Sequence, residues 1–383
     1  MLLHQITLKN LLSFGPDSKP LELRSLNVLI GPNGSGKSNL IDAISLLQAA
    51  ASDLMLPFRN GGGGTEWIWK GANPRTGEVS VVVRNEVFDL AHTMQFAARD
   101  RYFGLVLEQI GLWPLDAAKQ TTLRQDLLTG PLLSNGVTDI CGIPFEKLKH
   151  NQSLVSQASH NKSFEYAADL REGYQSIHIY RDWTFGRSAP LRQLARADEP
   201  GATVAPDYAN LAGVLGRATS EPLVKRAMLE RLDALCSGIT DIVVSPVAGF
   251  LELVLHIDNF RISAARLSDG TLRYLCLLAI LCDPKPPPLI CIEEPELGLH
   301  PDLIPTIADL LKEASERTQL IVTTHSDTLI DCFTRSPEDV VVCEKHNGQT
   351  EMTRLDGERL STWLEEYSLG TLWSQGEIGG NRW

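Results

Sequence analysis

The feature that most constrains this chain is a glycine-rich turn between an apolar run and an amphipathic segment. Residues 28–30 are apolar and predict a buried strand, and the apolar periodicity after Lys37 predicts a helix. Between them the sequence reads G-x-x-x-x-G-K-S from Gly31 to Ser38, which is the phosphate-binding P-loop. Strand, turn, lysine and helix stand in the order that this motif requires, which argues against a glycine turn without a ligand. The sequence therefore predicts binding of a nucleoside triphosphate.

Each part of this loop has an expected task. Its three glycines allow the backbone N–H groups to point inward, and the start of the helix adds partial positive charge at the same place. Lys37 is expected to reach the β- and γ-phosphates, and Ser38 to offer its hydroxyl to Mg²⁺. The predicted nucleotide-binding residues are Asn33, Gly34, Ser35, Gly36, Lys37, Ser38 and Asn39.

Composition limits the class of protein. The chain has 383 residues, 43% of them hydrophobic, which is enough for one elaborate domain or two lobes. No stretch approaches the roughly 18 consecutive apolar residues of a membrane helix, and the first residues do not have the layout of a signal peptide. The seven cysteines are scattered without a C-x-x-C pair and are expected to be reduced core residues. We therefore expect a cytoplasmic protein without a membrane partner.

The charge balance bears on nucleic-acid binding. A net charge of −12 argues against a protein that coats nucleic acid non-specifically. A local basic patch is still compatible with it, and Arg181, Arg187, Arg192 and Arg196 are candidates. Around them, residues 176–212 alternate aromatic and arginine residues without helical periodicity. This segment is either an ordered linker that packs through its aromatic side chains or a surface that faces phosphate or nucleic acid.

The pattern along the chain predicts several further elements. Residues 2–9 and 21–30 read as two strands around a turn at 13–17. Three later runs are expected to form an antiparallel meander on the nucleotide core, while residues 111–160 are a poorly patterned insertion. The meander strands are 79–84, 91–98 and 102–109; another strand is expected at 164–170, an amphipathic helix at 220–237, and strands at 239–244, 250–257 and 260–263.

Two adjacent carboxylates end an apolar strand in the second half of the chain. The run that begins at Leu289 finishes with Glu293 and Glu294, where a P-loop enzyme needs acidic residues beside its P-loop strand. Glu293 is expected to hold Mg²⁺ through water, and Glu294 to orient or deprotonate the attacking water. The usual residue at the first position is Asp, so the longer Glu293 would shift the water shell of the metal.

A histidine and a second anion site are also expected where a strand ends or a helix begins. His325 comes at the end of a third apolar strand, where it can hydrogen-bond a γ-phosphate or the attacking water. Ser268, Asp269 and Gly270 precede an apolar helix at 274–281, so that Ser268, Gly270 and the helix N-terminus form a second anion cradle; an ordinary helix cap is the simpler interpretation. Two cradles in one chain are explained by a head-to-tail dimer in which each subunit's second cradle closes on the other's ATP.

The segments GPNGSGKS, LSDGTLR, ICIEEPE and TTHSD, in this order, resemble the ABC-type ATPase heads of the RecF/SMC/OLD group. The chain looks most like the stand-alone RecF-like AAA family ATPases of bacteria, and this resemblance is strong over 1–50 and about 260–345. It implies an α/β fold: a P-loop head with a mixed β-sheet and flanking helices, an antiparallel β lobe and a helical lobe. A single head over 1–383 would contain a nucleotide-binding lobe (1–110), an insertion and connector (111–200), and a lobe (201–383) with the signature, the Walker B acids and the switch histidine.

The resemblance also assigns roles. It implies that Lys37 and Ser38 bind phosphate and Mg²⁺, that Glu294 is the catalytic carboxylate, and that His325 is the switch histidine. Ser268 and Gly270 would belong to the signature that touches the partner's γ-phosphate. This signature reads LSDG where transporters have LSGG, so Asp269 implies a different trans contact. Gln109 is a candidate Q-loop glutamine by its position after a lobe strand.

These observations lead to an expected function and to its competitors. We expect an ATP-hydrolysing switch that requires ATP and Mg²⁺, forms a homodimer through an ATP sandwich, and controls a separate nuclease or toxin effector in DNA repair or anti-phage defence. DNA is a further candidate partner. The alternative is a nucleotide-sensing, DNA-binding scaffold with negligible turnover, against which Glu294 and His325 argue. An energising subunit of a membrane transporter fits the LSDG signature and the β meander poorly.

Overall fold

The computed structural model describes residues 2–73, 75–84, 89–99, 102–113, 123–126, 139–140, 143–144, 152–157, 165–198, 202–233, 235 and 237–380. The chain divides into two compact units. Unit 1 consists of Met1–Ile177, Glu338–Leu355 and Gly376–Trp383, and unit 2 of His178–Pro337 and Asp356–Gln375. The predicted insertion at 111–160 lies mostly outside the described residues.

The division differs from the predicted lobes at 1–110, 111–200 and 201–383. Strand β17 (Val340–His346) belongs to unit 1 because it pairs in parallel with β3 (Leu26–Ile30), the strand before the P-loop. Strand β18 (Gln349–Arg354) continues that pairing antiparallel to β17. Pairing between strands more than 300 residues apart cannot be read from local sequence periodicity, which is why the predicted boundaries missed it.

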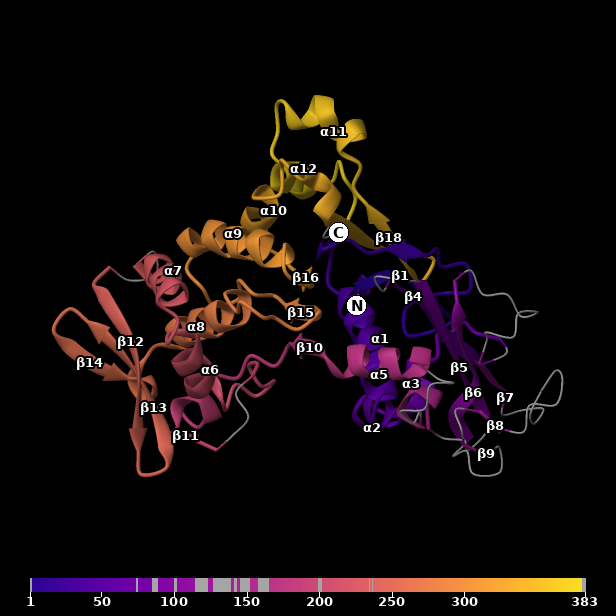
Figure 1. Cartoon of the computed structure of the whole chain (residues 1–383). Coiled ribbons are helices and arrows are strands. Elements are labelled where there is room, and N and C mark those ends of the chain that lie inside the picture. The colour runs from indigo at the N-terminus through magenta and orange to yellow at the C-terminus, as the bar shows by residue number, and fades with distance from the viewer. Residues whose placement is uncertain are drawn as a thin grey trace. The chain divides into compact units, whose positions relative to one another are not determined.

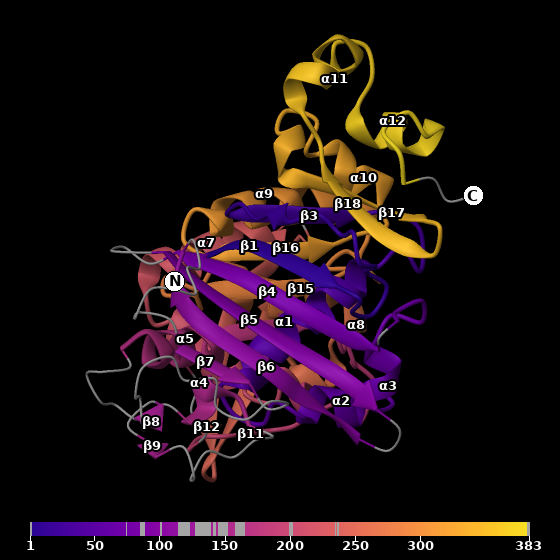
Figure 2. The same ribbon diagram turned by 90° about the vertical axis from the view of Figure 1, so that its right-hand side faces the viewer.

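The predicted meander is present in unit 1. Figure 2 shows its strands side by side, with β1, β4, β5 and β6 forming the middle of a six-stranded antiparallel sheet in the order β2-β1-β4-β5-β6-β7. In β4, side chains alternate between buried and half-exposed along most of the strand, as in a sheet with one covered face. The strands are β1 (Leu2–Lys9), β2 (Leu21–Glu22), β4 (Thr76–Arg84), β5 (Asp89–Arg99), β6 (Tyr102–Leu112) and β7 (Leu123–Asp126).

One predicted strand, 21–30, is interrupted. The structure has β2 and β3 with a turn between them, and the Asn27 side chain makes that turn. Its amide oxygen accepts from Arg24 N at 2.9 Å, and its amide nitrogen donates to Arg24 O at 2.7 Å. An asparagine that bonds to backbone three residues away offers the chain an alternative to continued strand.

The predicted strand at 164–170 is wrong. Helix α5 (Glu165–Gln175) occupies this segment, and its buried residues Ala167, Leu170 and Tyr174 recur at intervals of three and four. That spacing places them on one face of a helix. The helix packs against α1 (Lys37–Ala50), which follows the P-loop and is also in contact with α2 (Leu56–Asn60).

Other short elements complete unit 1. They are α3 (Gly64–Trp67), α4 (Leu154–Gln157) and the strand pair β8 (Asp139–Ile140) and β9 (Ile143–Pro144). Strand β10 (Ile177–Tyr180) begins where unit 1 gives way to unit 2.

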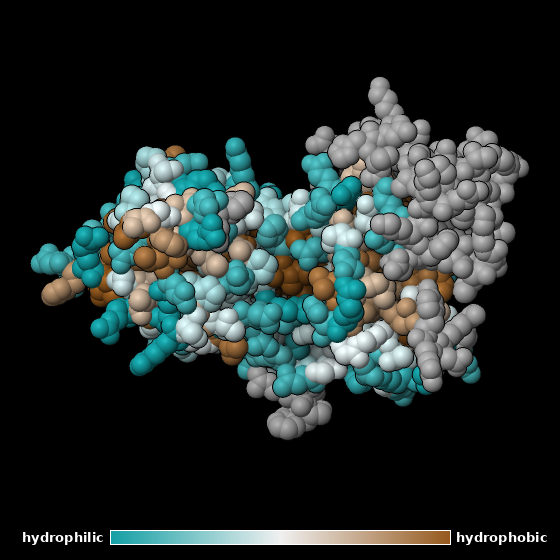
Figure 3. Space-filling view, turned by 90° about the horizontal axis from the view of Figure 1, so that it is seen from below, coloured by the Kyte–Doolittle hydropathy of each residue, from teal (hydrophilic) through white to brown (hydrophobic). Residues whose placement is uncertain are grey.

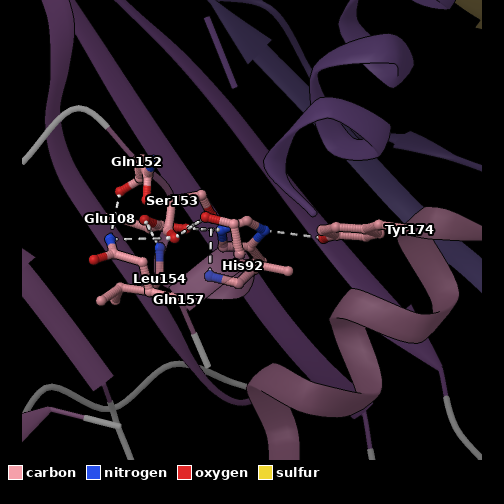
Figure 4. Close-up of polar contacts among 9 residues, drawn as sticks. His92, Glu108, Gln152, Ser153, Leu154, Gln157 and Tyr174 are labelled. Carbon is pink, nitrogen blue, oxygen red and sulfur yellow. Dashed lines mark hydrogen bonds and ion pairs between the residues drawn. The ribbon is translucent and has the colours of Figure 1, made fainter. Parts of the chain in front are cut away.

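A fully buried polar network joins the meander to its covering helices (Figure 4). His92 in β5 lies 2.9 Å from a Glu108 carboxylate oxygen through Nε2 and 2.9 Å from the Tyr174 hydroxyl through Nδ1. Glu108 also accepts hydrogen bonds from the Ser153 hydroxyl and from Leu154 N. Burial raises the pKa of Tyr174, so its hydroxyl stays protonated and donates to His92. The carboxylate therefore has three donors, which offsets the cost of burying it.

Unit 2 contains a parallel strand pair and a separate antiparallel sheet (Figure 1). Strands β15 (Leu289–Glu293) and β16 (Gln319–Thr323) pair in parallel, connected through α9 (Ile304–Ser315), and every residue of both is buried except Glu293. Helix α8 (Asp269–Leu281) is buried along most of its length. The smaller sheet consists of β11 (Ala195–Arg196), β12 (Ile239–Val247), β13 (Phe250–Ile257) and β14 (Phe260–Ser263), so the three strands predicted at 239–263 are present.

Among the remaining helices of unit 2, two are in contact with strand β12 of the smaller sheet. The helix predicted at 220–237 is present as α7 (Pro222–Asp233), and α6 (Leu211–Ala218), α10 (Asp327–Asp331), α11 (Gly357–Leu364) and α12 (Leu369–Gln375) are further helices. Apolar side chains that stay exposed include Phe250 and Phe260 in the smaller sheet. On the face shown in Figure 3, apolar areas lie among hydrophilic ones. Within the described ranges, none of the helices is long and apolar enough to span a bilayer.

The buried network generates a stability prediction. Replacing Glu108 by Ala leaves three buried donors without their acceptor, and each unsatisfied group costs about 1–3 kcal/mol, so we expect a loss of roughly 3 kcal/mol or more. Tyr174→Phe removes a single donor and should cost about 1 kcal/mol. Urea unfolding of both variants measures these losses. Thr93→Val, which removes a half-buried hydroxyl contact with Ser80 on the same sheet, is the matched control. Equal losses for Glu108→Ala and Thr93→Val would contradict the network's importance.

Candidate active site

The P-loop of unit 1 is a turn that only glycine can form at two positions. Gly31 and Gly36 have φ angles of 146° and 105°, in the region that residues with side chains rarely adopt. A β-carbon at Gly31 would lie 2.2 Å from the carbonyl oxygen of Cys343, and one at Gly36 would lie 2.2 Å from the Thr350 hydroxyl. The turn is therefore packed directly against β17 and β18.

Lys37 opens helix α1 and folds back over the turn. Its ammonium donates to the carbonyl oxygens of Gly31 at 2.8 Å and Pro32 at 3.1 Å, and the residue is 5% exposed. Asn33, Gly34 and Ser38 stay on the exposed side. The lysine is thereby held across the loop, while the exposed rim of the turn is open to an anion that the helix N-terminus attracts.

Two residues that the sequence analysis missed brace this loop. The Ser13 hydroxyl accepts from the Asn39 amide at 2.7 Å and lies 2.6 Å from the Thr350 hydroxyl, which in turn donates to Ser35 O at 2.8 Å. Asn39, predicted to bind nucleotide, thus engages the loop's own support in this structure. A serine in a turn and a threonine in an edge strand carry no local signal for this role, because the pairing of β18 brings them together.

In unit 2 the parallel pairing of β15 with β16 places the predicted polar residues at one edge. Glu293 lies opposite Thr323, so Glu294 and His325 both follow directly after the paired strand ends. His325 Nε2 is 3.6 Å from a Glu294 carboxylate oxygen, and each side chain is about one-third exposed. The structure therefore brings Glu293, Glu294 and His325 together at the ends of the two strands, with the imidazole and the Glu294 carboxylate within ion-pair distance.

Glu294 has a strained backbone. Its φ angle is 46°, the left-handed region, where a residue with a β-carbon pays about 1–2 kcal/mol. Hydrogen bonds at both of its backbone polar groups hold it there. Its N–H donates to Thr323 O at 2.9 Å, and its carbonyl oxygen accepts from Arg273 Nη2 at 2.8 Å and from Leu297 N at 3.1 Å. Strain of this kind persists only where surrounding groups enforce it, and it is concentrated at functional sites.

Glu296 is a further site residue that the sequence analysis did not assign. One of its carboxylate oxygens accepts hydrogen bonds from the Thr324 hydroxyl and from His325 N. Burial raises the pKa of Glu296, with a smaller contribution in the same direction from the Glu294 charge, whereas its hydrogen bonds oppose the shift. Glu296 therefore fixes the backbone that carries His325. The repeated acids in E-E-P-E were the available signal.

A metal at this edge would be held by few protein groups. Glu293 Oε1 lies 3.9 Å from Arg181 Nη2, so a cation would share this carboxylate with a guanidinium. No cluster of three or more His, Cys, Asp or Glu residues suited to a metal occurs in the described part of the chain. Mg²⁺ commonly uses only one or two protein oxygens and completes its shell with water and phosphate. The Glu293 carboxylate is a hard oxygen donor of that kind.

The signature segment, Leu267 to Gly270, forms the start of helix α8. Ser268 is the N-cap, and its hydroxyl accepts from Thr271 N at 3.1 Å. The Asp269 carboxylate is paired with Arg192, whose guanidinium also donates to Leu267 O at 2.7 Å. Arg192 is largely buried while Asp269 is exposed, so the guanidinium is a fixed partner that neutralises the extra charge of LSDG.

The segment at 176–212 packs through its aromatic side chains. Tyr180, Phe185 and Tyr208 are buried, and Tyr208 is stacked on Trp183 with ring centroids 5.3 Å apart. These rings are not available as a platform for bases, which favours the ordered-linker interpretation. Gln109 lies inside β6, paired with Thr93, and does not lie after the strand as the Q-loop suggestion supposed.

Comparisons with known proteins identify a family and a fold for this chain. Residues 26–331 match the family described as AAA domain, putative AbiEii toxin, Type IV TA system. No curated protein matches the chain. Among solved structures, an SMC head bound to the C-winged helix domain of ScpA is 17% identical, with a TM-score of 0.59 over 94% of this chain and 99% of that one.

Two archaeal structures give similar values. The Smc head domain of Pyrococcus furiosus with an extended coiled coil, bound to the C-terminal domain of ScpA, is 14% identical, with a TM-score of 0.57 over 95% of this chain and 99% of that one. The Smc head domain of Pyrococcus yayanosii with a coiled coil and joint is also 14% identical, with a TM-score of 0.52 over 95% and 99%. The predicted fold class is confirmed: the chain has the mixed α/β fold of an ABC-type P-loop ATPase head.

The strain at Glu294 can be tested by removing its cause. Glu294→Gly and Glu294→Ala both delete the carboxylate, but only glycine relieves the left-handed conformation, so the Gly variant should be more stable by up to about 1 kcal/mol. Thermal unfolding of the two variants measures the difference. Asp309, exposed inside α9, gives the control: there Gly should be less stable than Ala by about 1 kcal/mol. The same order at both positions would show that Glu294 is unstrained.

Proposed function

Because the chain belongs to the family described as AAA domain, putative AbiEii toxin, Type IV TA system, we propose that it is an ATP-hydrolysing switch that dimerises around ATP and controls a separate effector. The observation that carries this proposal is the pairing of a strained, half-exposed Glu294 with His325 at one strand edge. Backbone strain of this kind is concentrated at functional sites, which supports a catalytic role for Glu294.

The predicted site residues of both units have proposed roles in ATP hydrolysis. The backbone of residues 33–39 and Lys37 bind the phosphates of ATP, and Ser38 and Glu293 are the proposed ligands of Mg²⁺. Mg²⁺ would neutralise the charge that develops on the phosphate oxygens. Glu294 orients the attacking water and accepts its proton, and His325 hydrogen-bonds the γ-phosphate or that water.

The proposed dimer rests on the second anion cradle. Ser268, Asp269 and Gly270 would meet the γ-phosphate of the ATP bound by a second copy, where the N-terminus of α8 favours negative charge. Since each ATP would contact both copies in the dimer, it would bind the dimer more tightly than the separated chains. ATP would therefore stabilise the dimer by linkage, and hydrolysis would release it.

Several observations support a partner protein and the cellular setting. Two SMC heads of similar fold were solved bound to a domain of ScpA, which makes a protein partner a reasonable proposal for this chain as well. The family description names toxin–antitoxin systems, which fits a toxin or nuclease effector in anti-phage defence or DNA repair, with DNA as a further candidate ligand. The cysteines among the described residues are free, which favours a reducing cytoplasm.

The first test separates binding, turnover and assembly. Lys37→Ala should lose ATP binding, since the lysine supplies the charge at the phosphates. Glu294→Gln should keep ATP binding, lose turnover by about 10²–10⁴-fold, the usual contribution of a general base, and accumulate as a dimer with ATP and Mg²⁺. Isothermal titration, phosphate release and sizing chromatography measure the three properties. A monomer of Glu294→Gln at saturating ATP–Mg²⁺ would refute the sandwich, and negligible wild-type turnover would favour the nucleotide-sensing scaffold.

A second test concerns the charge of the LSDG signature. Arg192→Gln leaves Asp269 uncompensated where an anionic γ-phosphate is proposed to approach, so the ATP concentration for half-maximal dimerisation of Glu294→Gln should rise about tenfold, equivalent to about 1.4 kcal/mol. Adding Asp269→Asn removes the repulsion and should recover most of the loss. Light scattering during ATP titration measures both. If the second substitution recovers nothing, Arg192 serves only to hold its backbone partners.

A further inference from the structure

The peptide groups on either side of Glu294 are held by two side chains from distant parts of unit 2. Arg273 Nη2 donates to Glu294 O at 2.8 Å, and the Trp183 indole donates to Glu293 O at 2.7 Å. Arg273 comes from the middle of helix α8, whereas Trp183 lies in the segment after β10. Two successive carbonyl groups are thus fixed from outside the strand to which they belong.

The two donors also hold each other. The Arg273 guanidinium lies 4.4 Å from the centroid of the Trp183 ring, within the range of a cation–π contact. Trp183 is in turn stacked on Phe185 and Tyr208, with centroids 6.0 and 5.3 Å away. Because Arg273 is only 5% exposed, little water competes with the ring for its charge. Neither donor can turn away without losing this stack.

The charge of Arg273 suits the site. Burial lowers the pKa of Arg273, but the negative charges of Glu296 and Glu294 favour its protonated form. Arginine stays charged even with a lowered pKa, and its planar group can stack on an aromatic ring and donate from its edge at once. A lysine ammonium cannot do both in the same geometry.

We propose that Trp183 and Arg273 form a carbonyl clamp that keeps Glu294 in its left-handed conformation and thereby aims its carboxylate. This inference rests on the proposed role of Glu294 in hydrolysis. Without the clamp, the residue relaxes to a negative φ, which swings the side chain away from His325. Trp183 and Arg273 are positioning residues, since they act through the backbone of Glu294.

The clamp also gives the signature a route to Glu294 within one subunit. Arg273 lies five residues after Ser268, in the same buried helix whose N-terminus carries the signature. A rigid helix transmits a small shift at its N-terminus to a side chain in its second turn. The signature and the clamp therefore share one buried helix.

The decisive experiment uses Trp183→Phe, which keeps an aromatic ring for the stack and removes the indole donor. We expect kcat for ATP to fall about tenfold or more, while the Kd for ATP and the KM change less than about twofold, because the phosphate-binding loop is untouched. Arg273→Lys should lower kcat at least as much. The matched control is Tyr208→Phe, since its hydroxyl is buried without a hydrogen-bond partner among the described residues; kcat should stay unchanged.

The outcomes separate the clamp from the proposed function. If Glu294→Gln is inactive but Trp183→Phe and Arg273→Lys keep the wild-type kcat, the clamp is refuted and the role of Glu294 stands. If Glu294→Gln turns over like the wild type, both proposals fail. If the stack has only a structural role, Trp183→Phe should lower the melting temperature and weaken ATP binding together with kcat, and this result also overturns the clamp. Should Trp183→Phe not fold, Arg273→Lys decides by the same split between kcat and Kd.

Discussion

The turn between β3 and α1 depends on two positions that have no β-carbon. Only because Gly31 and Gly36 lack one can the carbonyl group of Cys343 and the hydroxyl of Thr350 approach the loop so closely. This contact joins β17 and β18 to the strand and helix that flank the P-loop. It brings together residues near position 30 and residues near position 345, and it lets Ser13, Asn39 and Thr350 brace the loop. Without these glycines, the supports of the loop would have to move outward.

In unit 2, several negatively charged side chains lie at one strand edge. Glu293, Glu294 and Glu296 lie within four residues of one another, and their mutual repulsion would disfavour the ionised site in isolation. Arg181 lies near Glu293, and the charge of buried Arg273 acts on both Glu294 and Glu296. The Glu296 carboxylate accepts a hydrogen bond from the backbone N–H of His325. Nearby cations and backbone donors thus make the acids compatible, and Glu294 remains the one that is both strained and half-exposed.

Predictions from sequence were mostly correct where the interactions are between neighbouring residues, and they failed where the interactions join residues far apart in the chain. Alternating patterns predicted β1 and the meander, because the period of a half-buried strand is set by its own residues. The break at residues 23–25 was missed because the Asn27 side chain, bonded back to Arg24, outweighed a run of strand-forming neighbours. The helix at 165–175 was mistaken for a strand because a short apolar window does not distinguish the two periods. The assignment of β17 to the P-loop unit depended on a pairing across most of the chain, which no local pattern records.

Short stretches of sequence specify the groups that this protein carries: a P-loop, two successive strand-end acids, a histidine after the next strand, and a serine-capped helix. These features are local, since each needs only a few neighbouring residues of fixed type and spacing. The tertiary structure alone decided what holds them. It placed a left-handed backbone at Glu294, Arg192 against Asp269, and Trp183 with Arg273 on two carbonyl groups of the acidic strand. Such contacts join residues 20 to 110 positions apart, and their geometry arises only when the helices and strands pack.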